Sequence, residues 1–212
     1  MKLLRRLSRF FVVLIWMGGL AAPAAAEFDE GIEYKTVPTE GARDGEVIEV
    51  LEFFYYGCPH CNALRPRLEQ WKRSLPDDVR FERIPAALNP RWTLFARAYY
   101  AAEALGVVEK GHGALFDAMH RENKKFSTRD DLADFWTQYG VDREQFLALM
   151  DDFHLDRTKV RRAASLGYRY GLEGVPSLVI DGRWRTSPSI AGGNANTLRV
   201  ADYLIEKARQ AR

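Results

Sequence analysis

The chain has two cysteines, Cys58 and Cys61, which form the sequence Cys58-Pro59-His60-Cys61. A disulfide between them closes a very short loop, and a bridge restricts the unfolded chain more as its loop lengthens, so this pair is a poor structural crosslink. A structural zinc site needs two further Cys or His ligands at a fitting spacing. The histidines supply no such second pair; they are His60, His112, His120 and His154. We therefore expect no metal, and a pair that alternates between dithiol and disulfide.

The cysteine pair stands where a strand is expected to turn into a helix. Residues 47–56 are rich in β-branched and aromatic side chains and largely apolar on both faces, as a covered central strand is. Gly57 ends this run, and residues 62–75 repeat apolar side chains at helical intervals. Free N–H groups and the positive end of the helix dipole stabilise a thiolate at Cys58, and a protonated His60 adds to this effect. A stable Cys58 thiolate is a good leaving group, which makes the disulfide oxidising.

A second motif lies more than a hundred residues further along the chain. Gly174-Val175-Pro176 places a proline directly before a short apolar strand, residues 177–180, and Asp181-Gly182 then predicts a turn into a second strand near 183–185. Proline cannot donate a hydrogen bond to a β-ladder, so Pro176 fits the entry to an edge strand. The alternative interpretation is a cis-proline that faces the cysteine pair.

Together these motifs resemble the DsbA family of periplasmic thiol:disulfide oxidoreductases, which have the thioredoxin fold. The stretch Leu51-Glu52-Phe53-Phe54 followed by Cys58-Pro59-His60-Cys61 is similar to the family's own motif, and the resemblance extends over residues 27–212. It implies that the four residues of the Cys-Pro-His-Cys motif are catalytic. Val175 and Pro176 would then flank Cys58 and offer backbone groups to an extended substrate peptide, a form of strand addition. The resemblance also implies that Pro176 keeps a metal from competing for the cysteines and that no cofactor is needed.

The remaining residues fit an α/β protein, namely a thioredoxin fold with an inserted all-helical domain. Strands are expected at residues 34–36 and 79–84, and a terminal helix at 196–209. Residues 91–170 are almost wholly helical in pattern, with Thr128 and Asp131 as an N-terminal cap. We expect a thioredoxin-like domain over 27–212, interrupted by a helical insertion at about 91–165. The large aromatic residues of this part are expected in the core; they are Phe95, Tyr99, Phe116, Phe135 and Trp136.

Glu52 is a carboxylic acid in the expected central strand. By strand alternation it shares a face with Val50 and Phe54, and neither face of the strand is expected to meet solvent. Burial beneath the cysteines raises the pKa of a carboxyl group, which would suit Glu52 to exchange a proton with Cys61. The alternative is a residue near a strand end that reaches water. The family resemblance implies the buried acid, and Arg83 on the neighbouring strand is a candidate for its basic counterpart.

The N-terminal residues have the pattern of a secretory signal peptide. Lys2, Arg5, Arg6 and Arg9 precede an apolar run over residues 10–22 and a small-residue end at Ala26. We expect residues 1–26 to be a cleaved signal peptide, with an uncleaved anchor as the alternative. Removing these four of the 31 basic residues leaves 27 against 29 acidic ones, so the formal charge changes from +2 to −2. A mature chain with this charge gives no reason to expect a nucleic-acid partner.

These inferences predict an enzyme of the periplasm that introduces disulfide bonds into reduced, exported polypeptides. In the DsbA family, a quinone-linked membrane partner of the DsbB type restores the disulfide. A disulfide isomerase or reductase would use the same cysteines, as would an oxidase dedicated to one partner. The familiar periplasmic isomerases need an N-terminal dimerisation domain, and only about 20 residues separate the signal peptide from the strand expected at 47–56, so we expect a monomer. The alternative from another class is a peptide-binding periplasmic chaperone.

Overall fold

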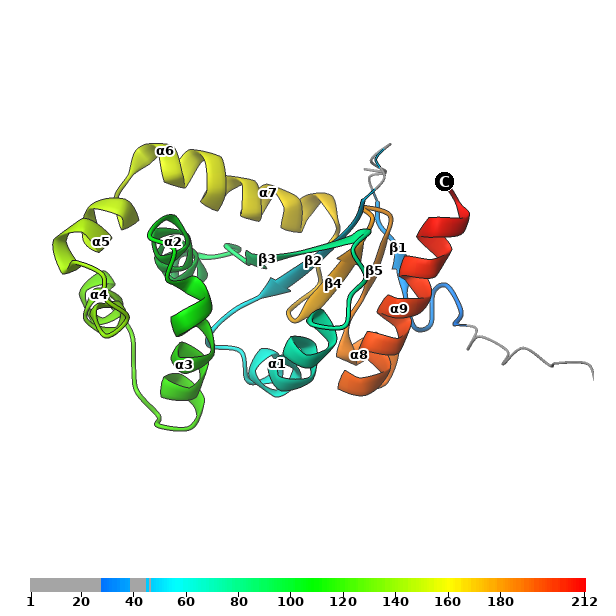
Figure 1. Ribbon diagram of the computed structural model, residues 1–212, viewed down its shortest axis with the longest axis horizontal. Helices are drawn as coiled ribbons and strands as arrows, with labels where there is room; N and C mark the ends of the chain where they lie inside the picture. The colour runs from blue at the N-terminus through cyan, green and yellow to red at the C-terminus, as the bar shows by residue number, and fades with distance from the viewer. Residues whose placement is uncertain (1–27, 39–44, 46) are drawn as a thin grey trace, which may run out of the picture.

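A mixed β-sheet forms the centre of the protein in the computed structural model, which describes residues 28–38, 45 and 47–212 (Figure 1). The expected signal peptide lies outside the described residues. Within them, the strand order is β1-β5-β4-β2-β3, with β2 parallel to β3 and antiparallel to β4. The strands are β1 Lys35–Thr36, β2 Ile48–Phe54, β3 Val79–Pro85, β4 Ser177–Ile180 and β5 Trp184–Thr186.

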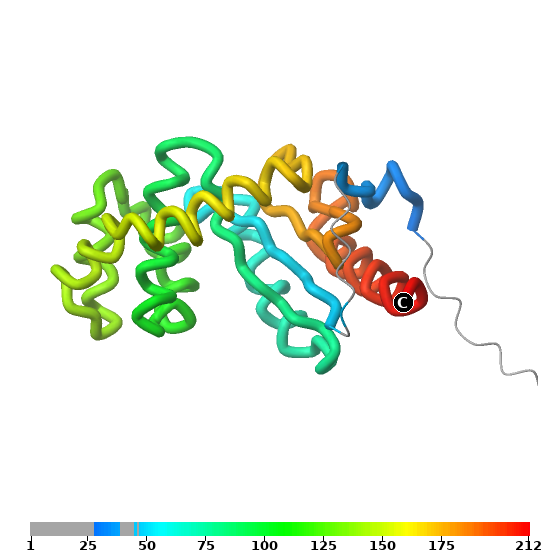
Figure 2. The backbone as a smooth tube through the Cα atoms, turned by 90° about the horizontal axis from the view of Figure 1, so that it is seen from above, coloured from blue at the N-terminus to red at the C-terminus, as the bar shows by residue number. Residues whose placement is uncertain are grey.

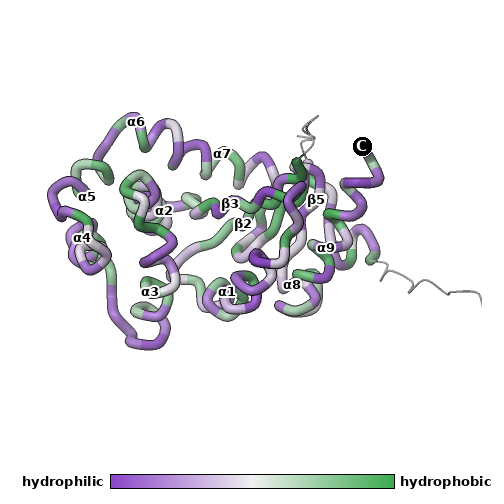
Figure 3. The backbone as a smooth tube through the Cα atoms, in the orientation of Figure 1, coloured by the Kyte–Doolittle hydropathy of each residue, from purple (hydrophilic) through white to green (hydrophobic). Residues whose placement is uncertain are grey.

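Strand β2 is buried along its whole length, as its apolar sequence predicts. One face of the sheet packs against the helices α1 (Pro59–Lys72) and α9 (Asn194–Gln210), in a core that contains Val50, Leu68 and Leu204. The opposite face packs against the helices that follow β3, in a second core that contains Leu51 and Phe53. Figure 3 shows hydrophobic residues along the strands and alternating hydrophilic and hydrophobic residues along α7 (Arg161–Arg169). Because both faces are covered, a side chain in the middle of β2 has no direct access to water.

Helix α1 begins directly after the strand–helix turn. Cys58 is its N-cap residue, and Pro59 follows as the first helical residue, where its fixed backbone angle is tolerated well. The helix therefore starts three residues before the expected position at 62. Its buried residues recur at helical spacing and turn toward the sheet; they are Cys61, Leu64, Leu68 and Trp71.

The chain between β3 and β4 is helical, as its periodicity predicts. Figures 1 and 2 show helices α2–α6 beyond one end of the sheet, with α7 leading back to it. The elements are α2 Pro90–Ala104, α3 Val108–His120, α4 Arg129–Thr137, α5 Arg143–Met150, α6 Phe153–Leu155, the π-helical turn η1 Asp156–Val160 and α7 Arg161–Arg169. The cap at Thr128 and Asp131 is confirmed, because each side chain bonds to the backbone N–H of the other residue. The boundaries expected for an inserted domain, about 91–165, stay a prediction.

The last elements complete the sheet. Strands β4 and β5 pair as a hairpin across residues 181–183, and the φ angles of Asp181 and Gly182, 53° and 63°, suit a tight turn. The helix α8 (Pro188–Ala191) and the long α9 follow, and α9 extends slightly beyond the expected range. Among the described residues, no helix has the length and apolar character needed to cross a membrane.

Aromatic side chains hold the helices beyond the sheet together, and the sequence predicted that these side chains are buried. Phe95, Phe116 and Trp136 are buried, and the ring of Trp136 covers the backbone of Gly111 in α3. A Cβ atom on Gly111 would overlap this ring, whereas a Cβ on Gly113 would meet the flexible end of the Arg65 side chain. Gly111 is therefore required by close packing between α3 and α4.

We predict that Gly111→Ala lowers the free energy of unfolding by about 1–3 kcal/mol, because an added methyl group in a dense core forces its neighbours to move. Chemical denaturation measures the change. The matched control is Gly113→Ala in the same helix, which we expect to be better tolerated because alanine favours the helix and Arg65 can shift. Equal destabilisation by the two variants would contradict the role given to Trp136.

Candidate active site

Cys58 lies at the junction between β2 and α1. Its backbone N–H donates to the Tyr55 carbonyl at 3.0 Å, which closes the turn after the strand, and its own carbonyl accepts from the Asn62 N–H at 3.1 Å. The Cys58 side chain is partly buried and the Cys61 side chain is 1% exposed. Both are free thiols in this structure. One sulfur is thus open to attack, and the other is covered.

The surroundings of Cys58 stabilise its thiolate. A hydrogen bond from the Cys61 thiol is the largest cause that lowers the pKa of Cys58, to about 6; burial opposes it, while the backbone N–H groups of Cys61 and His60 and the positive charge of His60 assist. Burial raises the pKa of Cys61 far above its usual value. Cys61 therefore keeps its proton, and its thiol can donate a hydrogen bond to the Cys58 thiolate. The sequence indicated the N–H groups and His60, but not the larger effect of the second thiol.

The cis-proline interpretation of Pro176 is confirmed. The Val175–Pro176 peptide bond is cis, and the Val175 carbonyl accepts a hydrogen bond from the Cys58 thiol at 3.4 Å. The hydroxyl of Ser177 donates to the Gly174 carbonyl at 2.7 Å, which ties the loop to the start of β4. A cavity of about 310 Å³ lies beside this loop and is lined by His60, Val175 and Pro176 together with residues of β5 and α8. The two sequence motifs therefore meet at one site.

Glu52 lies in the middle of β2, opposite Arg83 on β3 and Leu178 on β4. It is 5% exposed, so the alternative of a residue that reaches water is wrong. Burial raises the pKa of Glu52 to about 7; the charge of Arg83 opposes this rise and the charge of Glu69 adds to it. The Arg83 Nε lies 3.7 Å from the Glu52 Oε2, and neither atom has a hydrogen-bond partner in the described structure. Glu52 is therefore paired by charge but not by a hydrogen bond to Arg83.

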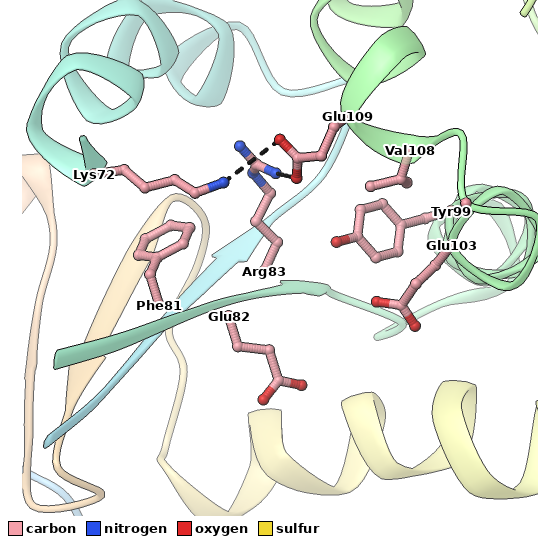
Figure 4. Close-up of a pocket in the computed structure, with 9 residues that line it drawn as sticks. Lys72, Phe81, Glu82, Arg83, Tyr99, Glu103, Val108 and Glu109 are labelled. Atoms are coloured by element: carbon pink, nitrogen blue, oxygen red, sulfur yellow. Dashed lines mark hydrogen bonds and ion pairs between the residues drawn. The ribbon is translucent and has the colours of Figure 1, made fainter. Parts of the chain in front are cut away.

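The terminal nitrogens of Arg83 are held by two other acids. Its Nη1 donates to Glu109 of α3 at 2.6 Å, and its Nη2 donates to Glu69 of α1. Figure 4 shows Arg83 and Lys72 both directed toward Glu109. Arg83 was expected as a basic counterpart of Glu52, but Glu69 and Glu109 were not expected, because they lie far from each other and from β3 in the sequence.

His112 and His120 belong to no motif in the sequence, but both support the active-site turn. The Tyr56 hydroxyl is 2.9 Å from the His112 Nδ1, and the Tyr56 carbonyl is 2.7 Å from the His120 Nε2. Burial lowers the pKa of His112, so its imidazole is neutral. The spacing of these two histidines around Phe116 places all three on one face of α3, which is the signal that could have indicated a shared partner.

Comparison with known proteins agrees with this geometry. A family model described as a DSBA-like thioredoxin domain matches residues 49–204. The chain belongs to this family. The thiol:disulfide interchange protein DsbA of Azotobacter vinelandii is 39% identical over 188 residues, which cover 88% of this chain and 87% of that protein. The DsbA of Pseudomonas aeruginosa is 40% identical over 195 residues, which cover 91% of each chain.

Solved structures lead to the same family and fold. The crystal structure of Pseudomonas aeruginosa DsbA has a TM-score of 0.81 and 38% identity to this protein, and it covers 87% of this chain and 96% of its own. The structure of DsbA from Xylella fastidiosa has a TM-score of 0.77 at 32% identity, with 84% and 96% covered. The DsbA-like chain is therefore a thiol:disulfide oxidoreductase with a thioredoxin fold that carries inserted helices. Its described residues contain no cluster of three or more potential metal ligands from His, Cys, Asp or Glu.

We predict that Cys61→Ala raises the pKa of Cys58 above about 6, because the variant removes the hydrogen bond that lowers it most. The ultraviolet absorbance of the thiolate, followed against pH, measures this value. Cys61→Ser is the matched control, because its hydroxyl group still donates a hydrogen bond, and we expect a smaller rise. Equal values in Cys61→Ala and the reduced wild type would show that the second thiol has no such effect.

We predict that Glu52 makes the protein less stable as the pH rises from 4.5 to about 7, because the folded state binds its proton more tightly than the unfolded state. The total loss is about 3 kcal/mol for a shift of this size. Urea denaturation of the reduced wild type and of Glu52→Gln at several pH values measures it, since the titration of Cys58 cancels in the difference. A difference between the two proteins that does not change with pH would contradict the raised pKa.

Proposed function

We propose that this DsbA-like protein introduces disulfide bonds into reduced, exported polypeptides through Cys58 and Cys61. The observation that carries the proposal is the asymmetry of the pair: the accessible Cys58 has a pKa lowered to about 6, whereas burial raises the pKa of Cys61. Stabilisation of the Cys58 thiolate favours the reduced enzyme over its disulfide. Such a disulfide accepts electrons readily from substrate thiols, so oxidation is the favoured direction.

The reaction proceeds in two exchanges. A substrate thiolate attacks the Cys58 sulfur, a new bond forms between these two sulfurs, and the bond to Cys61 breaks with its electron pair on Cys61. A second substrate thiolate then attacks the substrate sulfur of the mixed disulfide and releases the Cys58 thiolate. The substrate loses two electrons and gains a disulfide, while the enzyme gains two electrons as a dithiol. Cys58 is the thiolate that leaves in the second step, which its low pKa favours.

Glu52 supplies the proton that Cys61 takes up in the first exchange. A carboxyl with a pKa of about 7 is partly protonated at neutral pH and can give its proton to a much more basic thiolate. The charge of Glu52 also disfavours a negative charge on Cys61, which supports an interaction between the two groups. Arg83 limits the rise in the pKa of Glu52 through its own charge.

The substrate peptide binds beside Val175 and Pro176. When Cys58 is protonated, its thiol donates to the Val175 carbonyl, so this carbonyl points toward the sulfur that a substrate must reach. An extended peptide that enters the adjoining cavity can bond to this backbone. His60 lines the same cavity, where its charge supports the Cys58 thiolate.

The N-terminal sequence and the DsbA family support a proposal for the cellular setting of this reaction. Residues 1–26 direct export to the periplasm, and a quinone-linked membrane protein of the DsbB type reoxidises Cys58 and Cys61. The protein acts as a monomer and needs no cofactor of its own. An isomerase, a reductase or a peptide-binding chaperone would share parts of this site, and the following experiment separates them.

We predict that the oxidised protein forms disulfides in a reduced peptide with two cysteines and that Cys58→Ser reduces this activity to the background rate. Equilibration with glutathione should show a disulfide that is reduced more easily than that of thioredoxin. Mass spectrometry after alkylation measures both reactions.

Three results would speak against the oxidase. A potential as reducing as that of thioredoxin would indicate a reductase, and preferred repair of wrongly paired disulfides would indicate an isomerase. Suppression of aggregation that Cys58→Ser retains, with no oxidation by the wild type, would indicate a chaperone.

A further inference from the structure

A second pocket, of about 340 Å³, shares no lining residue with the cavity beside Val175 and Pro176. Figure 4 shows Lys72 at the end of α1, Arg83 on β3 and Glu109 on α3 converging there. Arg83 is the residue that links this pocket to the active site, because its Nε faces the buried Glu52. The arrangement therefore connects the proposed proton donor to groups at the surface.

The hydrogen bonds of Arg83 favour the outer acids over Glu52. The Arg83 side chain is only 3% exposed, and its two terminal nitrogens donate to Glu109 and Glu69. The Nε is left facing Glu52 at 3.7 Å without a hydrogen bond. A guanidinium bonded to a buried carboxylate in the usual bidentate way would hold that carboxylate in its charged form. Here both terminal nitrogens donate to the outer acids, and Nε has no hydrogen-bond partner, so no bidentate pair with Glu52 forms.

The cluster around Arg83 contains one more acid than cations, so one bound proton makes it neutral. Glu52, Glu69 and Glu109 face two cations, Arg83 and Lys72, so three ionised acids would give the cluster a net negative charge. Glu69 and Glu109 are 32% and 67% exposed and are hydrogen-bonded to Arg83, whereas the Glu52 side chain is 6% exposed. Burial disfavours a charge most strongly at Glu52. The proton that makes the cluster neutral therefore belongs on Glu52.

The pKa values of the individual groups agree with this assignment. Burial raises the pKa of Glu52 to about 7. Burial also acts to raise the pKa of Glu109, but the charges of Arg83 and Lys72 outweigh it and hold that pKa below its usual value.

The other ionisable groups around Glu52 carry no competing charge. Burial raises the pKa of Tyr56 after β2, of Cys61 in α1 and of Tyr99 in α2, so these groups keep their protons at pH 7. Burial lowers the pKa of His112 in α3, so this imidazole is neutral as well. On β4, the residue opposite Glu52 is the apolar Leu178. Glu82 and Glu103 also line the pocket, and they pair with Arg162 and Lys159 rather than with Arg83.

We propose that Glu69 and Glu109 are positioning residues that hold the Arg83 guanidinium away from a hydrogen-bonded pair with Glu52 and thereby keep the Glu52 carboxyl able to hold a proton. The inference deepens the proposed function, because it rests on Glu52 as the proton donor to Cys61. Loss of either acid frees a terminal nitrogen of Arg83 and removes a negative charge from the cluster. Both changes stabilise the Glu52 carboxylate.

The test is the titration of the Glu52 carboxyl carbon by NMR in the wild type, Glu69→Gln and Glu109→Gln, with Glu52→Gln to assign the signal. We expect the midpoint of Glu52 to fall by about 1 pH unit or more in both variants, the size of shift that a closer opposite charge produces. Glu82→Gln is the matched control, because Glu82 lines the same pocket and contacts Arg162 instead of Arg83. We expect its midpoint to stay close to that of the wild type.

Unchanged midpoints in Glu69→Gln and Glu109→Gln, or shifts no larger than that in Glu82→Gln, would overturn the inference, whatever happens to stability. The rate at which a dithiol peptide reduces the Cys58–Cys61 disulfide, followed against pH, tests the proposed function separately. If the Glu52 midpoint falls and the pH profile of this rate follows it, both proposals are supported. If the midpoint falls and the profile does not follow, the positioning role stands and Glu52 is not the proton donor.

Discussion

The unequal burial of the two cysteines is the constraint on which the chemistry of this site depends, because it lets Cys61 keep its proton while Cys58 is stabilised as a thiolate. It requires that Cys58 end the strand–helix turn as N-cap while Cys61 lies one turn further along the buried face of α1. The same helical geometry gives the two sulfurs opposite surroundings, one partly open and one covered by the sheet. A Cys-x-x-C sequence at any other place in the fold would not produce this difference, because it needs both a helix N-terminus and a core beneath it.

The position of the turn between β2 and α1 depends on the helices that follow β3. Tyr56 stands two residues before Cys58 and is held through its hydroxyl by His112 and through its carbonyl by His120. Phe54 and Phe116 pack around the imidazole of His112, so both polar and aromatic contacts hold α3 against the end of β2. The helices beyond the sheet are thus part of the support of the active site. The contacts of α3 with Tyr56 and Phe54, together with the dense packing of these helices, hold the strand–helix turn in place.

The sequence predicted those parts of the fold and the site that depend on local patterns. The cysteine pair, the strand before it, the helical region and the burial of Glu52 could all be inferred from residue type and periodicity, and the cis-proline was one of two interpretations of Pro176. The start of α1 was misplaced because Pro59 and His60 carry no apolar periodicity. The contacts of Arg83 were missed because Glu69 and Glu109 come from separate helices whose packing on β3 leaves no pattern in the sequence.

The arrangement of charges explains how an acid can be buried in a central strand without being fixed in one protonation state. An ion pair with full hydrogen bonding would hold Glu52 charged, and an apolar environment alone would hold it neutral. Glu52 lies between these limits. Arg83 is close enough to oppose the effect of burial on the pKa of Glu52, but its hydrogen bonds go to Glu69 and Glu109 instead of to Glu52. The Cys58 sulfur instead contacts the carbonyl of Val175, and the cis-proline loop that carries this carbonyl lines a different cavity. Thiol exchange and the control of the buried acid therefore involve two cavities with different lining residues. The two are coupled through Glu52, because its charge disfavours a negative charge on Cys61.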